Sequence, residues 1–207
     1  MSDVPVNPVI YHITHFNNLA GILRDGGLYC DALRKQQNIA NTNIGHQHIK
    51  QRRLLRKVDA GAHGMLGDYV PFYFCYRSVM LLSVSSGHAD YGGGEDEIVH
   101  LVSSAKTAIA LGQPWAFSDR HAELQHALYY DDLRHLDEVT WSAMPKTYWQ
   151  DCKELRQAEF LVHQFFAWKA VELIGVKSPG MKARVEATLR SAGSRVQVES
   201  KPGWYYK

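Results

Sequence analysis

Residues 156–163 read Arg156-Gln157-Ala158-Glu159-Phe160-Leu161-Val162-His163, and they set one carboxylate at the head of an apolar run that continues to Phe166. Apolar and polar side chains alternate around it, which predicts a strand over residues 159–166 with Glu159 on one face of a sheet. A carboxylate is costly to bury unless it is paired or used in chemistry. Glu159 is therefore a candidate general acid or base, and an ion pair with Arg156 is the structural alternative.

Short strands and helices surround this segment. Strands are predicted over residues 9–14, 28–30, 70–74, 98–102, 115–118, 171–176 and 195–198. Helices are predicted over residues 19–23, 49–55, 78–83 and 179–191, with one more after Ser118-Asp119, a typical helix cap. Residues 31–58 otherwise form a long loop, and the glycine-rich residues 88–96 a mobile one. This mixture predicts an α+β fold. The lack of a GxGxxG or GxxxxGK[ST] motif argues against Rossmann and P-loop folds.

Length and charge bound the class of protein. A chain of 207 residues fits a single domain over residues 1–207. The net charge of +2 points to no partner, but residues 31–59 hold seven Lys or Arg against two Asp. Such a local excess is typical of a surface that faces phosphates, in a dinucleotide or a nucleic acid. A solvated helix face is an equally good explanation from charge alone.

Cysteine usage and hydropathy predict a soluble cytoplasmic protein. The three cysteines form no CxxC pair, which argues against a disulfide framework and a zinc site. His121 and His126 have no third ligand at a matching spacing, so no metal is expected. The N-terminus lacks the pattern of a signal peptide, and no apolar run is long enough to span a membrane.

Two further motifs carry polar side chains suited to a ligand. His12 and Thr14 alternate in Tyr11-His12-Ile13-Thr14, so both lie on one face of the predicted strand and are candidates to bind a ribose or an amide. A core histidine with a surface threonine is the alternative. Arg52 and Arg53 are adjacent, so one is expected to face a cleft, where its planar fork suits phosphate, and the other to face solvent.

Four motifs in this order resemble the DarT family of DNA ADP-ribosyltransferase toxins. They are Tyr11-His12-Ile13-Thr14, the segment from Asn43-Ile44-Gly45 to Ile49-Lys50-Gln51-Arg52-Arg53, Leu66-Gly67-Asp68-Tyr69-Val70-Pro71-Phe72-Tyr73-Phe74, and Gln157-Ala158-Glu159-Phe160-Leu161-Val162. The chain departs from the family pattern at Cys75-Tyr76-Arg77-Ser78-Val79-Met80, where Pro-Arg-Ser-Pro-Met is expected. That departure concerns local loop geometry.

The resemblance implies an ADP-ribosyltransferase fold, a split mixed sheet with flanking helices and a cleft for NAD, the donor of ADP-ribose. Glu159 matches the catalytic glutamate, and Arg52 is the preferred catalytic arginine, with Arg53 as the second choice. The residues implied to bind NAD are His12, Ile13, Thr14, Gly21, Leu28 and Arg52. His121 is implied to lie near the acceptor base, within residues 115–157, which resemble the ADP-ribosylating turn-turn loop.

The implied activity is transfer of ADP-ribose from NAD to a base in single-stranded DNA, with thymine favoured by similarity, so that replication is blocked. A macrodomain antitoxin similar to DarG is the implied protein partner, and no membrane is involved. Trp141, Tyr148 and Trp149 are candidates for stacking on bases, with core packing as the alternative. A transferase acting on protein or RNA and a non-catalytic nucleic-acid-binding module are the alternative functions.

Overall fold

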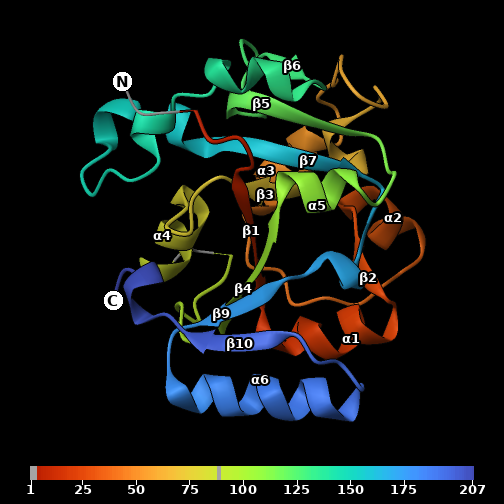
Figure 1. Cartoon of the computed structure of the whole chain (residues 1–207), viewed down its shortest axis with the longest axis vertical. Coiled ribbons are helices and arrows are strands. Elements are labelled where there is room, and N and C mark those ends of the chain that lie inside the picture. Colours follow the sequence, from red (N-terminus) through yellow and green to blue (C-terminus); the bar gives the residue numbers. More distant parts are fainter. Residues whose placement is uncertain (1–3, 88–89) are drawn as a thin grey trace.

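A mixed sheet of eight strands forms the centre of the computed structural model, which describes residues 4–87 and 90–207 (Figure 1). Its strand order is β10-β9-β4-β1-β3-β7-β5-β6, and a separate sheet pairs β2 with β8. Within the described chain, β9 and β10 pair in parallel and the remaining strand pairs are antiparallel. The predicted α+β class is confirmed.

The strands are β1 (Val9–His15), β2 (Gly27–Tyr29), β3 (Tyr69–Tyr73), β4 (Ile98–Ser104), β5 (Trp115–His121), β6 (Tyr129–Tyr130), β7 (Ala158–His163), β8 (Phe165–Ala167), β9 (Leu173–Val176) and β10 (Gln197–Ser200). The helices are α1 (Leu19–Arg24), α2 (Asp31–Gln36), α3 (Gln47–Arg53), α4 (Val79–Ser85), α5 (Ala105–Ile109) and α6 (Pro179–Ser191). Between β6 and β7 the chain makes short 3-10 turns, among them Trp141–Ala143, Gln150–Cys152 and Leu155–Gln157.

Strand β7 lies inside the sheet between β3 and β5. Because side chains alternate along a strand, Phe160 and Val162 pack into the main core while Leu161 packs into a second cluster on the opposite face. Both faces of β7 are therefore covered, which explains its nearly continuous apolar sequence. Glu159 shares the face of Leu161 and stands directly opposite Tyr73 of β3.

The strand predicted over residues 159–166 is two strands in two sheets. Strand β7 ends at His163, and Gln164 takes the left-handed conformation with φ of 59°. Its N–H donates to the carbonyl of Asp68 at 2.7 Å, and its own carbonyl accepts from the N–H of Cys30 at 2.8 Å. These bonds turn the chain, so that β8 leaves the main sheet and pairs with β2.

The helix predicted after Ser118-Asp119 is wrong, because β5 continues through both residues to His121. The Asp119 carboxylate accepts from the Leu128 N–H at 2.9 Å and so holds the β5–β6 hairpin. Ser118 Oγ accepts from the Glu159 N–H at 3.0 Å and so ties β5 to β7. The two polar side chains thus form hydrogen bonds within the sheet and do not cap a helix.

Residues 31–58 hold two helices, α2 and α3, where the sequence predicted one. The Cys30 sulfur caps α2 by accepting a hydrogen bond from the Leu33 N–H. Cysteine is not one of the residue types that usually cap helices, so the sequence did not predict the start of α2. Of the loop predicted over residues 88–96, residues 88 and 89 lie outside the described chain. Over the described ranges, no helix has the length and apolarity that a membrane span requires.

Candidate active site

A cavity of about 500 Å³ lies between β1, β2, β3 and the segment from α2 to α3. Several residues of the predicted NAD site line it, together with the predicted arginines and His121: His12, Ile13, Thr14, Gly21, Leu28, Arg52, Arg53 and His121. Residues 153, 154 and 157, just ahead of β7, close another side. The structure therefore gathers residues from four distant parts of the chain around one hollow.

Glu159 lies behind this cavity and is reached from it through Arg53. The Glu159 side chain is 1% exposed, and Arg53, at 12%, lines the cavity. Nη1 of Arg53 donates to both carboxylate oxygens, at 3.0 and 2.9 Å. Burial by itself would lower the pKa of Arg53, but the charge and hydrogen bonds of Glu159, together with Tyr73 and Asp31, outweigh burial, and the net pKa is raised. The pair is thus a closed ion pair on the floor of the site.

Arg52, the preferred catalytic arginine, points elsewhere. Its Nε donates to Glu123 at 2.5 Å, and its side chain is 53% exposed. One arginine faces inward and the other toward solvent, as predicted, but it is Arg53 that contacts Glu159. The alternative ion pair between Glu159 and Arg156 is wrong, because Arg156 donates to the backbone carbonyls of Ala143 and Met144.

Tyr73 and His121 complete the surroundings of the Glu159–Arg53 pair. Tyr73 lines the cavity, and burial followed by the charge of Glu159 raises its pKa. Burial lowers the pKa of His121, although the Glu159 carboxylate opposes the shift. At neutral pH, both side chains are therefore uncharged. Tyr73 was not predicted as a site residue, although it follows Pro71 and Phe72 in the same motif.

The β1 wall of the cavity presents His12 and Thr14 on one face, as their alternation predicts. The ring Nδ1 of His12 donates to the Pro71 carbonyl at 2.8 Å, and burial lowers its pKa. Thr14 is 5% exposed and its Oγ1 accepts from Asn18 Nδ2 at 3.0 Å. The alternative of a surface threonine is therefore wrong, since both side chains belong to the lining.

A second ion-pair cluster joins α2 to α3 at the cavity. Asp31 accepts from Arg34 Nη2 at 2.8 Å and from Lys50 Nζ at 3.3 Å. Burial alone would raise the pKa of Asp31, but these two cations bring it down to about 2. Together with Arg52 and Arg53, Lys50 gives α3 three ion pairs to three separate segments. The basic segment is therefore an ordered wall of the cavity, with its cations beside the hollow.

The three candidates for base stacking differ in exposure. Tyr148 is 92% exposed, whereas Trp149 is 6% exposed. The Trp141 ring packs edge-on against Phe74 with centroids 5.1 Å apart, and its Nε1 donates to the Leu136 carbonyl. Core packing, the alternative, therefore accounts for both tryptophans, and of the three Tyr148 alone offers a free ring face.

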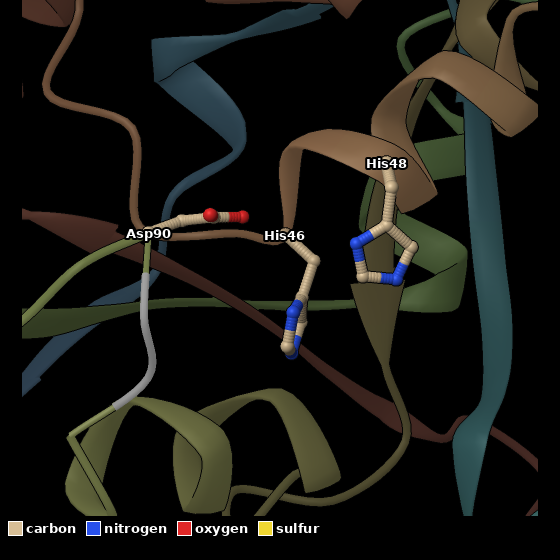
Figure 2. Close-up of side chains that lie close together, drawn as sticks. All are labelled: His46, His48 and Asp90. Atoms are coloured by element: carbon tan, nitrogen blue, oxygen red, sulfur yellow. The ribbon is translucent and has the colours of Figure 1, made fainter.

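His46, His48 and Asp90 gather beside the start of α3 (Figure 2). Their nitrogen and oxygen atoms that could bind a metal all lie within 4.8 Å of one another, and His48 and Asp90 are exposed. Asp90 Oδ2 accepts from the Gln47 N–H at 2.7 Å, so it anchors the first turn of α3 to the segment ahead of β4. This bond gives Asp90 a structural role in holding α3, and the absence of a metal site in this protein stays a prediction.

Comparisons with known proteins agree with this geometry. The family model described as "ssDNA thymidine ADP-ribosyltransferase, DarT" matches residues 11–206. A DNA ADP-ribosyl transferase of Thermus aquaticus is 43% identical over 98% of this chain and 91% of its own length, and one of Escherichia coli is 32% identical over 98% and 95%.

Solved structures agree as well. DarT of Thermus sp. 2.9 in complex with ADP-ribosylated ssDNA superposes with a TM-score of 0.92 at 40% identity, covering 98% of both chains. Its complex with NAD+ gives a TM-score of 0.86 at 39% identity, covering 98% of this chain and 99% of the other. DarTG of Thermosipho africanus, at 19% identity, shares the fold with a TM-score of 0.80, covering 96% of this chain and 51% of that one. This chain therefore belongs to the DarT family of single-stranded DNA thymidine ADP-ribosyltransferases.

Proposed function

We propose that this protein transfers ADP-ribose from NAD to a thymine base in single-stranded DNA. The observation that carries the proposal is the buried Glu159–Arg53 pair at the floor of a cavity lined by cations and carboxylates. DarT of Thermus sp. 2.9, about 40% identical and solved with NAD+ and with ADP-ribosylated ssDNA, supports the same donor and acceptor. The alternatives, a transferase for protein or RNA and a silent nucleic-acid-binding module, lack such support.

The cavity suits a dinucleotide in size and charge. Its volume of about 500 Å³ falls within the range of small-molecule sites, which is roughly 300–1,000 Å³. Lys50, Arg52 and Arg53 line it, each paired with a carboxylate, and would bind the pyrophosphate by exchanging that partner for a phosphate oxygen. On the opposite wall, His12 and Thr14 offer polar groups for a ribose or the nicotinamide amide. Ile13, Gly21 and Leu28 supply the apolar and close-fitting surface.

Glu159 would act through charge. NAD supplies ADP-ribose by breaking the bond between its ribose and nicotinamide, and positive charge develops on the ribose as that bond breaks. A fixed carboxylate nearby lowers the energy of this charge more than that of the ground state. Because Nη1 of Arg53 occupies both Glu159 oxygens, Arg53 must turn toward the cavity before Glu159 can act. We therefore assign Arg53, rather than Arg52, as the catalytic arginine.

The acceptor base would enter beside His121, which lines the cavity near the charge of Glu159. His121 is uncharged at neutral pH, so it can accept a proton or a hydrogen bond from an incoming base. Tyr148, on the neighbouring loop, would stack on an exposed base. Residues 1–207 would act as one unit in the cytoplasm, as a toxin that blocks replication and that a DarG-like macrodomain antitoxin counteracts.

The test is to incubate the protein with NAD and, separately, single-stranded DNA, RNA and protein acceptors. We expect a mass increase of one ADP-ribose on a thymine-containing oligonucleotide, located to thymine by fragmentation. Glu159→Ala should abolish the increase and keep DNA binding, while Glu186→Gln on α6 should behave as wild type. Transfer to RNA or protein but not to single-stranded DNA would contradict the proposal.

A further inference from the structure

Arg156 is a buried cation that the transfer chemistry does not use. The residue is 3% exposed, and its described hydrogen bonds all go to backbone carbonyls. Nη1 donates to the carbonyls of Ala143, at 2.6 Å, and Met144, and Nη2 donates to that of Arg77 at 3.2 Å. A guanidinium is costly to remove from water without a carboxylate partner, so its position calls for a specific explanation.

The same guanidinium holds both ends of an exposed loop tip. Residues 145–148 are all exposed, and the tip ends in Tyr148. On the near side, Arg156 binds the carbonyls of Ala143 and Met144. On the far side, the guanidinium carbon lies 5.6 Å from the ring centroid of Trp149, which is a cation–π contact. One side chain therefore fixes the stems from which the tip projects.

Arg156 also joins this loop to the strand that carries Glu159. It lies in the 3-10 turn Leu155–Gln157, directly before β7. Lys153, Glu154 and Gln157 of the same segment line the cavity. The loop tip, the cavity rim and the catalytic strand are thus connected within a few residues, and a shift of Arg156 changes where the tip stands relative to the cavity.

We propose that Arg156 is a positioning residue for single-stranded DNA, which holds residues 145–148 in the conformation that receives the substrate strand. This inference rests on the proposed function, because it names the role of the loop in that reaction. The shape of the arginine side chain explains why this position holds arginine. One guanidinium nitrogen donates to two carbonyls, another donates to a third carbonyl, and the flat group lies over the Trp149 indole. A lysine ammonium is a point donor with no flat face.

The test compares Arg156→Lys and Arg156→Met with wild type, and Arg190→Lys, on the exposed side of α6, is the matched control. For Arg156→Lys we expect the KM for an oligonucleotide to rise about tenfold, as expected when one base–aromatic stack is lost, with the KM for NAD unchanged. Lys146 lies in the tip, so trypsin should cut there several times faster in both Arg156 variants. Circular dichroism shows whether each variant is folded. Arg156→Lys keeps the positive charge and is therefore the variant expected to fold if Arg156→Met does not.

The outcomes separate this inference from the proposed function. Unchanged KM for DNA together with unchanged cleavage at Lys146 would overturn it, as would a parallel rise in both KM values, which indicates a general loss of structure. If wild type transfers nothing to single-stranded DNA, the proposed function fails. The cleavage rates then still decide whether Arg156 anchors the tip.

Discussion

Nη1 of Arg53 lies 3.0 Å from one carboxylate oxygen of Glu159 and 2.9 Å from the other, across 106 residues of sequence. The contact joins the last residue of α3 to the second residue of β7. Successive residues on a helix point about 100° apart, so Arg52 and Arg53, which both line the cavity, bind different partners: Arg53 binds Glu159 and Arg52 binds Glu123. The structure thus distinguishes two arginines that the sequence left equal in chemistry.

We expect Arg53→Ala to be far more damaging than Arg52→Ala. Removing Arg53 leaves the buried Glu159 carboxylate unpaired, which should cost about 3 kcal/mol of unfolding free energy. The exposed Arg52–Glu123 pair should contribute less than about 1 kcal/mol. Transfer to DNA should fall about a hundredfold or more in Arg53→Ala and less than about tenfold in Arg52→Ala. Urea unfolding and transfer rates measure both, and a larger effect of Arg52→Ala would contradict our assignment.

Local patterns predicted most of the strands and most of the helices, because alternation and capping are properties of neighbouring residues. The Ser118-Asp119 error shows the limit of that reasoning. The same side-chain oxygens can cap a helix or join two strands. Which they do here depends on the backbone N–H groups of Leu128 and Glu159, and neither lies within the few residues that a capping motif spans. The partner of Glu159 could not be predicted either, since Arg156 is near in sequence but faces away.

Protonation of His100 should destabilise the protein below neutral pH. His100 is fully buried between the Tyr76 carbonyl and the Tyr205 hydroxyl, and burial lowers its pKa from 6.5 to about 4. Between these values the unfolded chain binds the proton and the folded protein does not, so stability falls as pH decreases. From pH 7 to pH 5 this one group should cost about 2 kcal/mol.

Urea unfolding at the two pH values measures that loss. The loss should be smaller in His100→Gln, although this variant is less stable at pH 7 because a buried hydrogen bond changes. His126→Gln is the control, since that side chain is 57% exposed. An equal pH dependence in wild type and His100→Gln would contradict the assignment.

Gly27 should tolerate no side chain. A Cβ there would lie 2.2 Å from the Phe166 carbonyl oxygen, so the alanine variant must push β2 away from β8. Because Gly27 and Leu28 line the cavity, Gly27→Ala should weaken NAD binding as well as lower the melting temperature. Gly180→Ala on α6 meets nothing closer than 3.9 Å and should be neutral or slightly stabilising. Calorimetric titration measures NAD binding, and thermal unfolding measures the melting temperature. If Gly27→Ala melts at the same temperature as wild type, the predicted clash with Phe166 is wrong.

Tyr148 and Trp149 are neighbours in sequence with opposite exposure, so alanine at each should affect different quantities. Tyr148→Ala removes an exposed ring and should leave stability unchanged while weakening DNA binding by roughly fivefold to a hundredfold, the range of one base–aromatic stack. Trp149→Ala removes a buried ring and should cost about 3 kcal/mol of unfolding free energy. Fluorescence anisotropy with a labelled oligonucleotide and urea unfolding measure the two effects separately. If Tyr148→Ala binds DNA as tightly as wild type, the exposed tip is not a stacking platform, and the strand must be held by other residues around the cavity.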